Sequence, residues 1–246
     1  MKISFVVPAY NEEKNIKKCL DSILLEIERS GLGQESEIVV VNNASTDKTG
    51  EILSSIRGIK VVDEPKKGLV WARRAGLLNS CGELVANVDS DTLMPKGWLK
   101  KVVSEFDKNS KLLALSGPFI YYDLSFWSNL AVKIWYIIGF LLNMINNLLG
   151  ISSMLQGGNF IVRRSALEKI GGYDTSIEFY GEDTDIARRV RKIGKVKWTF
   201  SLPMYTSGRR IKGEGFVNVA FKYAINFLWT AFKGRPITQK HKDIRF

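Results

Sequence analysis

Acidic and amide side chains are concentrated at three places that follow apolar, strand-like runs. Asn42-Asn43 follows one such run, Asp89-Ser90-Asp91 follows another, and Glu182-Asp183 comes much later in the chain. In an open α/β sheet the ligand crevice lies at the carboxyl ends of the strands, so polar residues just after strands face one cleft. Carboxylates there can hold a divalent metal ion against a diphosphate and leave another carboxylate free as a general base. These clusters together predict a metal-dependent site for a nucleoside diphosphate.

Each cluster taken singly also has a plainer explanation. The segment Asn42–Asp47 is compatible with a capped helix start and nothing more. The two like charges of Asp89 and Asp91 are costly unless a cation or solvent compensates them, yet a D-x-D pattern also occurs by chance in many loops. The run Gly181–Asp185 could be simple acidic capping at the start of an arginine-rich helix. The prediction therefore depends on the combination.

Composition bounds the class of protein. The chain has 246 residues, 45% of them hydrophobic, which suits one domain or one domain with attachments. Its 36 Lys and Arg against 25 Asp and Glu give a net charge of +11, which favours an anionic partner such as a nucleotide, a nucleic acid or an acidic membrane surface. Cys19, Cys81 and His241 are too few for a disulfide framework or a Cys/His zinc site. No signal-peptide pattern precedes the first strand, so we expect the N-terminus in the cytoplasm.

The first half of the chain alternates short apolar runs with helical patterns, which predicts βαβ units. Asn11 is expected to cap the first helix, with Glu12 in its first turn, and Gly31 is expected to end it. The predicted fold class is α/β, with a Rossmann-like, mostly parallel sheet flanked by helices. The strands are expected near 3–7, 37–41, 59–62, 84–88 and 112–116, and the helices near 12–29, 47–56, 69–80 and 96–107.

The order and context of the motifs resemble the family 2 glycosyltransferases of GT-A fold, over most of residues 1–210. The resemblance implies transfer of a sugar, with inversion, from a nucleoside diphosphate donor to an acceptor hydroxyl, as in the synthesis of cell-envelope polysaccharides. The matching segments are Val6–Glu12, Val41–Asp47, Ala72–Gly76 before Gly82-Glu83, Asp89–Asp91, Gly157–Phe160 before Arg163-Arg164, and Gly171–Asp174 before Gly181–Asp185.

The resemblance also implies residue roles. Asp91 matches the metal ligand, Asp89 lies near the ribose or the metal, and Asp183 matches the catalytic base. Its neighbour Glu182 would raise the pKa of Asp183 or orient the acceptor. The expected cofactor is Mg or Mn, because these hard cations neutralise a leaving diphosphate through oxygen ligands. The candidate nucleotide-binding residues are Pro8, Ala9, Tyr10, Glu12, Asn43 at the base, Arg73 and Asp89, and Arg209 and Arg210 are further candidates for the diphosphate.

Two departures from the family pattern bear on the reaction. Asn42-Asn43 stands where an acidic pair is more usual, which leaves the donor base open among UDP, GDP and dTDP. The Q-x-x-R-W signature of processive synthases is absent, and Arg188–Lys192 stands there instead, which favours transfer of a single sugar. A sugar-phosphate nucleotidyltransferase would want a glycine-rich N-terminal loop, which Pro8–Asn11 does not supply. The alternative of a non-catalytic basic scaffold or nucleic-acid-binding protein is suggested by the net charge alone. No nucleic-acid-binding signature accompanies the basic residues.

Two apolar segments have narrow polar stripes at helical spacing. Such segments are either two core helices packed on each other or a pair lying in the plane of a membrane interface, with Trp127, Trp135 and Trp229 in the headgroup zone. A transmembrane span is disfavoured, because a single crossing would separate Asp91 from Asp183. The first stripe comprises Asn129, Lys133, Tyr136, Asn143, Asn147 and Gly150, and the second comprises Asn218, Lys222, Asn226, Thr230 and Lys233.

The C-terminal tail is basic, with Lys233, Arg235, Lys240, Lys242 and Arg245 against Asp243 alone. Together with the apolar segments it predicts a peripheral protein on the cytoplasmic face of an anionic membrane, acting on a lipid-linked acceptor. The chain divides into a nucleotide-sugar-binding half (1–118), an apolar helical insertion (119–155), an acceptor and catalytic-base half (156–212), and an amphipathic helix with a basic tail (213–246).

Overall fold

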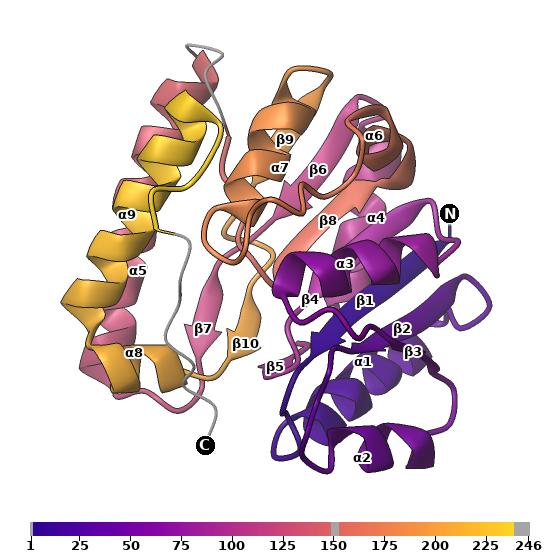
Figure 1. Ribbon diagram of the computed structural model, residues 1–246. Helices are drawn as coiled ribbons and strands as arrows, with labels where there is room; N and C mark the ends of the chain where they lie inside the picture. Colours follow the sequence, from indigo (N-terminus) through magenta and orange to yellow (C-terminus); the bar gives the residue numbers. More distant parts are fainter. Residues whose placement is uncertain (1, 149–152, 239–246) are drawn as a thin grey trace.

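The structure is a computed structural model that describes residues 2–148 and 153–238. Strands and helices alternate through most of the chain (Figure 1). The strands are β1 (Ile3–Ala9), β2 (Ser36–Asn42), β3 (Lys60–Asp63), β4 (Leu84–Val88), β5 (Thr92–Leu93), β6 (Leu112–Ser116), β7 (Phe119–Tyr121), β8 (Asn159–Arg163), β9 (Lys195–Trp198) and β10 (Met204–Thr206). The helices are α1 (Ile16–Ser30), α2 (Thr49–Ser55), α3 (Leu69–Leu78), α4 (Trp98–Lys108), α5 (Phe126–Leu148), α6 (Arg164–Lys169), α7 (Glu182–Arg191), α8 (Arg209–Glu214) and α9 (Phe216–Lys233).

The main sheet has seven strands in the order β3-β2-β1-β4-β8-β6-β9. All neighbouring strands are parallel except β8, which runs antiparallel to both β4 and β6. The predicted α/β class with a mostly parallel sheet flanked by helices is therefore confirmed. Because β1, β2 and β4 are parallel neighbours, their carboxyl ends lie at one edge of the sheet, where Asn42 pairs with Ala9 and Asp89 follows Val88.

Alternating side chains of the strands build a hydrophobic core on each face of the sheet. On one face Phe5 packs with buried residues of α1 and α4, such as Leu20 and Leu99, and its ring lies 6.1 Å from that of Trp98. On the other face Val6 belongs to a core with α3, α6 and α7. These two cores fix the helices that carry the candidate site residues.

Most of the predicted elements match the observed ones to within a few residues, but the start of the first helix was predicted wrongly. Gly31 does end α1, with φ of 76°. Asn11 does not cap it, since α1 begins only at Ile16. Instead Asn11 has φ of 50°, and its Oδ1 accepts a hydrogen bond from the Thr46 N–H. The intervening residues form a turn that brings Glu12 towards the strand ends.

A second, three-stranded sheet was not predicted. It has the order β5-β10-β7, and β5 begins directly after Asp91. The strand β10 leads into α8 and α9, whereas β7 leads into α5. This small sheet therefore connects the Asp89–Asp91 motif to the C-terminal helices, which lie at one end of the molecule (Figure 1).

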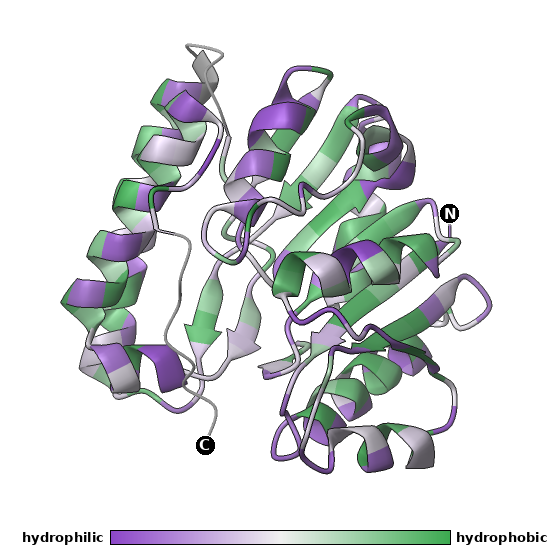
Figure 2. Cartoon of the chain, in the orientation of Figure 1, coloured by the Kyte–Doolittle hydropathy of each residue, from purple (hydrophilic) through white to green (hydrophobic). Residues whose placement is uncertain are grey.

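The middle parts of the polar stripes of α5 and α9 face the protein, and the apolar arcs face outwards. The stripe residues Lys133, Asn218 and Lys233 are exposed. Asn143 is 3% exposed on α5, and Asn226 and Thr230 are buried on α9. Tyr136 stacks on Trp198 with ring centroids 5.8 Å apart. Hydrophobic residues recur along both helices (Figure 2), and exposed ones include Phe126, Trp127, Ile134, Ile138, Leu141, Ile145, Phe221, Leu228, Trp229 and Phe232. Asn147 is described in its backbone only, whereas Gly150 and the tail residues from 239 lie outside the described residues.

Among the described helices, α5 is long and apolar enough to cross a membrane by length and composition alone. The window Phe126–Asn146 has a mean hydropathy of 1.4, and 17% of it is buried inside the protein.

Candidate active site at the strand ends

A buried arginine joins the two acidic motifs. Arg73 on α3 is 1% exposed, and its Nη2 donates to Asp89 Oδ1 at 3.2 Å. Its Nη1 lies 3.2 Å from Glu182 Oε1. Burial acts to lower the pKa of Arg73, but Glu182 and Asp89 outweigh it and raise that pKa, so the guanidinium stays charged. The end of β4 and the start of α7 are thus held together by one cation.

Two glycines just before β8 also bond to both acidic motifs. The Gly157 N–H donates to Asp183 Oδ2 at 2.8 Å, and the Asp89 N–H donates to the Gly158 carbonyl at 3.4 Å. Gly158 has φ of 78°, and a Cβ there would lie 2.2 Å from the Asp89 carboxylate. A side chain at this position would displace Asp89, so only glycine fits.

Glu182 and Asp183 begin α7, and both carboxyls bind protons more tightly than usual. Burial raises the pKa of Glu182 to about 8, with Arg73 acting in the opposite direction. Burial also raises the pKa of Asp183, against hydrogen bonds from the Thr184 and Gly157 N–H groups. The Thr184 N–H donates to Oδ1 at 2.7 Å, so each carboxylate oxygen of Asp183 is fixed by one backbone donor. Lone pairs remain on both oxygens, and a fixed carboxylate of raised pKa has the properties of a general base.

A second arginine lies across two other carboxylates. Arg209, the first residue of α8, places its Nε 3.0 Å from Asp91 Oδ2. Its Nη1 donates to Glu12 Oε2 at 3.1 Å, and its Nη2 contacts Glu12 Oε1. The Asp91 side chain is 12% exposed, and burial raises its pKa to about 7 while Arg209 opposes that rise. Arg209, predicted as a diphosphate contact, therefore pairs here with two carboxylates.

The donor set at this edge suits a divalent metal that is completed by a substrate. In the described residues, no three or more His, Cys, Asp or Glu side chains converge as a metal cage. Asp91 and Glu12 nevertheless converge on one cation, the Arg209 guanidinium. Mg²⁺ commonly binds through one or two carboxylates together with substrate phosphates, so hard oxygen ligands of this kind fit such an ion. Asp91, with Asp89 two residues before it, would hold the ion.

The candidate base-contacting residue, Asn43, is buried and fully engaged with a neighbouring loop. Its Nδ2 donates to the Glu64 and Lys66 carbonyls at 3.0 and 2.8 Å, and its Oδ1 accepts from the Gly68 N–H at 2.8 Å. These three bonds shape the loop that precedes α3. Nearby, the Lys67 Nζ donates to the Tyr10 hydroxyl at 2.6 Å.

The remaining predicted residues are Pro8, Ala9 and Arg210. Pro8 and Ala9 end β1, paired with Val41 and Asn42 of β2. Arg210 turns towards α9: its Nη1 donates to Glu214 Oε1 at 2.9 Å, and its guanidinium lies 4.9 Å from the centre of the Phe179 ring. The structure does not bring Arg210 to Asp91.

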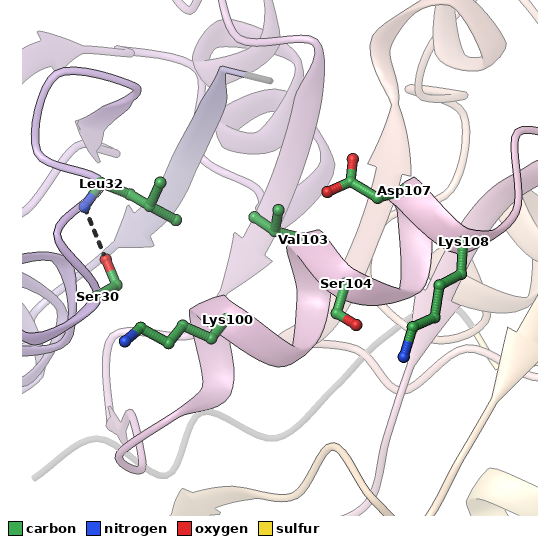
Figure 3. A pocket seen from close by; sticks show the side chains of 7 residues that line it. All are labelled: Ser30, Leu32, Lys100, Val103, Ser104, Asp107 and Lys108. Carbon is green, nitrogen blue, oxygen red and sulfur yellow. Dashed lines mark hydrogen bonds between the residues drawn. The ribbon is translucent and has the colours of Figure 1, made fainter.

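A surface pocket of about 380 Å³ lies between α4 and the end of α1 (Figure 3). It is lined by Ser30, Leu32, Lys100, Val103, Ser104, Asp107 and Lys108. None of these belongs to the acidic motifs, so this pocket is separate from the candidate site.

Comparison with known proteins identifies the family. Residues 4–171 match the family model described as Glycosyl transferase family 2. The chain belongs to glycosyl transferase family 2. The resemblance to this family in the sequence is thereby confirmed. The matched range contains the Asp89–Asp91 motif and the Gly157-Gly158 loop and ends before α7.

Several curated glycosyltransferases are similar in sequence. The Poly-beta-1,6-N-acetyl-D-glucosamine synthase of Staphylococcus epidermidis is 30% identical over 182 residues, which cover 71% of this chain and 42% of that protein. Glycosyltransferase GlyA of Streptococcus pneumoniae is 38% identical over 110 residues, which cover 42% of this chain and 15% of that protein. The chain thus spans less than half the length of these relatives.

Solved glycosyltransferases share the fold. The mannosyltransferase PcManGT from Pyrobaculum calidifontis, in complex with GDP-Man and Mn²⁺, aligns with a TM-score of 0.71 and 20% identity over 95% of this chain and 63% of that one. TarS 1–349 of S. aureus, in complex with UDP-GlcNAc, aligns with a TM-score of 0.62 and 22% identity over 84% of this chain and 58% of that one. These likenesses support the GT-A fold.

Proposed function

We propose that this glycosyltransferase moves one sugar, with inversion and with a divalent metal, from a nucleoside diphosphate to an acceptor hydroxyl. The observation that carries the proposal is the Arg73 bridge, because it holds Asp89 of the metal-binding motif and Glu182, next to the base candidate, within one ion-paired group. A leaving diphosphate and an attacking hydroxyl must meet at one carbon atom. A rigid link between the side chains that bind the diphosphate and those that position the hydroxyl keeps the two reacting groups aligned.

Asp183 is the group that accepts the proton of the acceptor hydroxyl. A hydroxyl is a poor nucleophile at neutral pH, so a positioned carboxylate must take its proton as attack proceeds. The Gly157 and Thr184 N–H groups fix the direction of the Asp183 carboxylate, and its raised pKa strengthens it as a base. Glu182 acts as a positioning residue, because it touches Arg73 rather than open space.

Asp91, with Asp89, is the carboxylate that would hold Mg or Mn. The bound ion would neutralise the negative charge of the leaving diphosphate. That PcManGT is in complex with GDP-Man and Mn²⁺ supports this choice of cofactor. Arg73 and Arg209 supply the adjacent positive charge of the chain itself. A sugar-phosphate nucleotidyltransferase is a weaker candidate, since no glycine-rich loop follows β1.

The orientation of α5 and α9 supports action at a membrane surface. A surface helix of a soluble protein normally buries its apolar stripe and exposes its polar one. Here Asn226 is 1% exposed while Phe232 is 62% exposed, and α5 has the same inverted arrangement. Large apolar patches of this kind mark a partner surface. Lys133, Lys233 and Arg235 are exposed on or beside these helices, which suits anionic headgroups.

We therefore infer a peripheral enzyme on the cytoplasmic face of an anionic bilayer, with a lipid-linked acceptor. The apolar arcs of α5 and α9 would lie in the interface plane, with Trp127, Trp135 and Trp229 at headgroup depth. A lipid-linked acceptor would then reach the strand ends without leaving the bilayer. Transfer of one sugar rather than polymerisation rests on the absence of the Q-x-x-R-W signature.

Donor binding tests the catalytic part of the proposal. UDP-, GDP- and dTDP-sugars are screened by calorimetry with Mn²⁺ or Mg²⁺, and slow hydrolysis is followed. We expect one base to bind with metal present, and Asp91→Ala to weaken that metal-dependent binding at least about 100-fold while circular dichroism shows an intact fold. Unchanged metal-dependent affinity in Asp91→Ala would remove Asp91 from the metal site.

A further inference from the structure

The position of Arg209 suggests a role beyond that of a diphosphate contact. Its guanidinium uses Nε on Asp91 and both terminal nitrogens on Glu12, so it already fills the place where those two carboxylates converge. Glu12 is 2% exposed. Two mostly buried carboxylates side by side would repel each other without a cation between them. Arg209 thus performs, between these two carboxylates, the charge compensation that a metal would perform.

Asp91 cannot keep this contact and ligate a metal with the same oxygen. The Arg209 Nε lies 3.0 Å from Oδ2, so an ion on that oxygen would occupy the place of the guanidinium, and the two cations would repel each other. A metal ion that binds Oδ2 therefore competes with the guanidinium for that oxygen. This competition follows from the proposed metal-binding role of Asp91 and rests on it.

The side chain of Arg209, and not its helix, is the part that can move. The backbone before α8 is fixed by Asp123, whose Oδ1 accepts from the Gly208 N–H at 2.5 Å and whose Oδ2 accepts from the Lys212 Nζ at 2.9 Å. The Ser207 hydroxyl also donates to Asp123 at 3.1 Å. With its Cα held, Arg209 can still redirect its guanidinium by rotation about its flexible side-chain bonds.

We propose that Arg209 is an internal counter-cation that competes with the metal for Asp91 and transfers to the diphosphate when a metal-bound nucleotide enters. A guanidinium pairs well with phosphate oxygens, so the nucleotide supplies the partner that the displaced side chain needs. Metal and diphosphate binding are therefore positively coupled through Arg209. By linkage, each ligand raises the affinity for the other by the same factor.

The test uses Mn²⁺ alone and Mn²⁺ with inorganic pyrophosphate, which needs no knowledge of the donor base. Calorimetry gives the Mn²⁺ affinity of the wild type, Arg209→Gln and Arg209→Lys. We expect Arg209→Gln to bind Mn²⁺ alone at least about tenfold more tightly, since the ion pair of the guanidinium with Asp91 no longer competes. Pyrophosphate should tighten Mn²⁺ binding several-fold more in the wild type than in Arg209→Gln. Arg209→Lys, whose ammonium cannot make the three-nitrogen contact with both carboxylates, should fall between them.

Lys212→Ala is the matched control, because Lys212 is a cation on the same helix that pairs with Asp123 rather than Asp91. It should bind Mn²⁺ like the wild type. Equal or weaker Mn²⁺ binding by both Arg209 variants, with native circular dichroism, would overturn the proposal and leave Arg209 as a structural or diphosphate-binding residue. The metal role of Asp91 is judged separately: if Asp91→Ala binds Mn²⁺ normally, the proposed function itself fails at that step.

Discussion

At the residue scale, the two acidic motifs differ in what surrounds each carboxylate. Asp91 contacts a guanidinium, so it is already compensated as a metal ligand would be. Asp183 instead accepts hydrogen bonds from the Gly157 and Thr184 N–H groups, which fix the direction of its carboxylate. This difference in partners, more than the acidic character that the two share, separates the proposed electrostatic role from the proposed base role.

Replacement of Asp183 by Asn should remove the base and keep the donor site. Both side chains have similar shape, and the Asn Oδ1 can still accept one of the two backbone hydrogen bonds. We expect donor affinity within about threefold of the wild type, and turnover lower by at least about 100-fold, the usual contribution of general base catalysis. Calorimetry and steady-state kinetics measure the two quantities. Near-normal turnover would mean that another residue takes the proton.

The pH dependence of turnover should report the same carboxyl. A base works only when ionised, so turnover falls as the pH falls through the pKa of Asp183. Because burial raises that pKa, the acidic limb should lie above the ordinary range of an aspartic acid. The limb is measured as kcat against pH at saturating donor and metal. A limb at the ordinary aspartate pKa, near 4, would contradict the assignment.

At the scale of elements, the loop before α3 depends on the amide of Asn43. Aspartate at this position, the more usual residue of the family, cannot donate to the Glu64 and Lys66 carbonyls. We expect Asn43→Asp to lower the free energy of unfolding by about 2 kcal/mol, since two partly buried hydrogen bonds lose their donor. Urea unfolding measures it. Asn42→Asp, whose amide bonds to the more exposed Asp63, is the control and should cost about 1 kcal/mol or less.

The alternative result is equally informative. If Asn43→Asp folds with unchanged stability but alters the preference between UDP and GDP, Asn43 contacts the base as the family resemblance implies. In that case the loop bonds are exchanged when the nucleotide binds.

The predictable elements are those with local periodicity. Strands β1, β2 and β4 follow from their apolar runs, and the clustering of polar residues after them follows from the rule that parallel strands end at one edge. The small sheet was missed because β5 has two residues and β7 and β10 have three each, too few for any period.

Contacts between distant residues were also not predictable. Arg209 and Glu12 are 197 positions apart, and nothing in one sequence marks such a pair beyond opposite charge. The prediction that Asn43 contacts a base rests on the family resemblance, whereas its hydrogen bonds to the Glu64 and Lys66 carbonyls lie in a loop whose path the sequence does not show. The direction in which α5 and α9 turn their polar stripes likewise depends on where Trp198 and residues 236–238 pack.

At the scale of the whole molecule, the candidate active site lies at the ends of the strands, and the exposed apolar surface lies on α5 and α9. The small sheet connects them, because β5 follows Asp91 and β10 leads to α8 and α9. Under the membrane proposal, a bilayer that covers the apolar arc of α9 would stabilise a helix whose Asn226 is buried and whose Phe221 and Phe232 are exposed. The acceptor of such an enzyme would arrive along the surface that binds it.

Vesicle flotation tests the membrane proposal. Purified protein should rise with anionic liposomes at low salt and less so at high salt, since each nearby Lys or Arg adds about 1 kcal/mol on an anionic surface. Trp229 and Phe232 are 42% and 62% exposed, and burial of each large apolar side chain is worth about 1.5–3 kcal/mol. Replacing both by Ser should therefore reduce the bound fraction at least about tenfold.

The matched control is the double replacement of Leu25 and Leu78 by Ser. These leucines are also exposed, but they lie on α1 and α3 and not on α5 or α9. It should float like the wild type, and any loss would indicate a general effect of surface polarity. Protein that stays at the bottom of the gradient but runs as a dimer, and becomes monomeric with Trp229→Ser and Phe232→Ser, would assign the arc to a second copy of the chain. The membrane proposal would then fail, while sugar transfer at the strand ends would stand, because no residue of that site lies on the exposed arc.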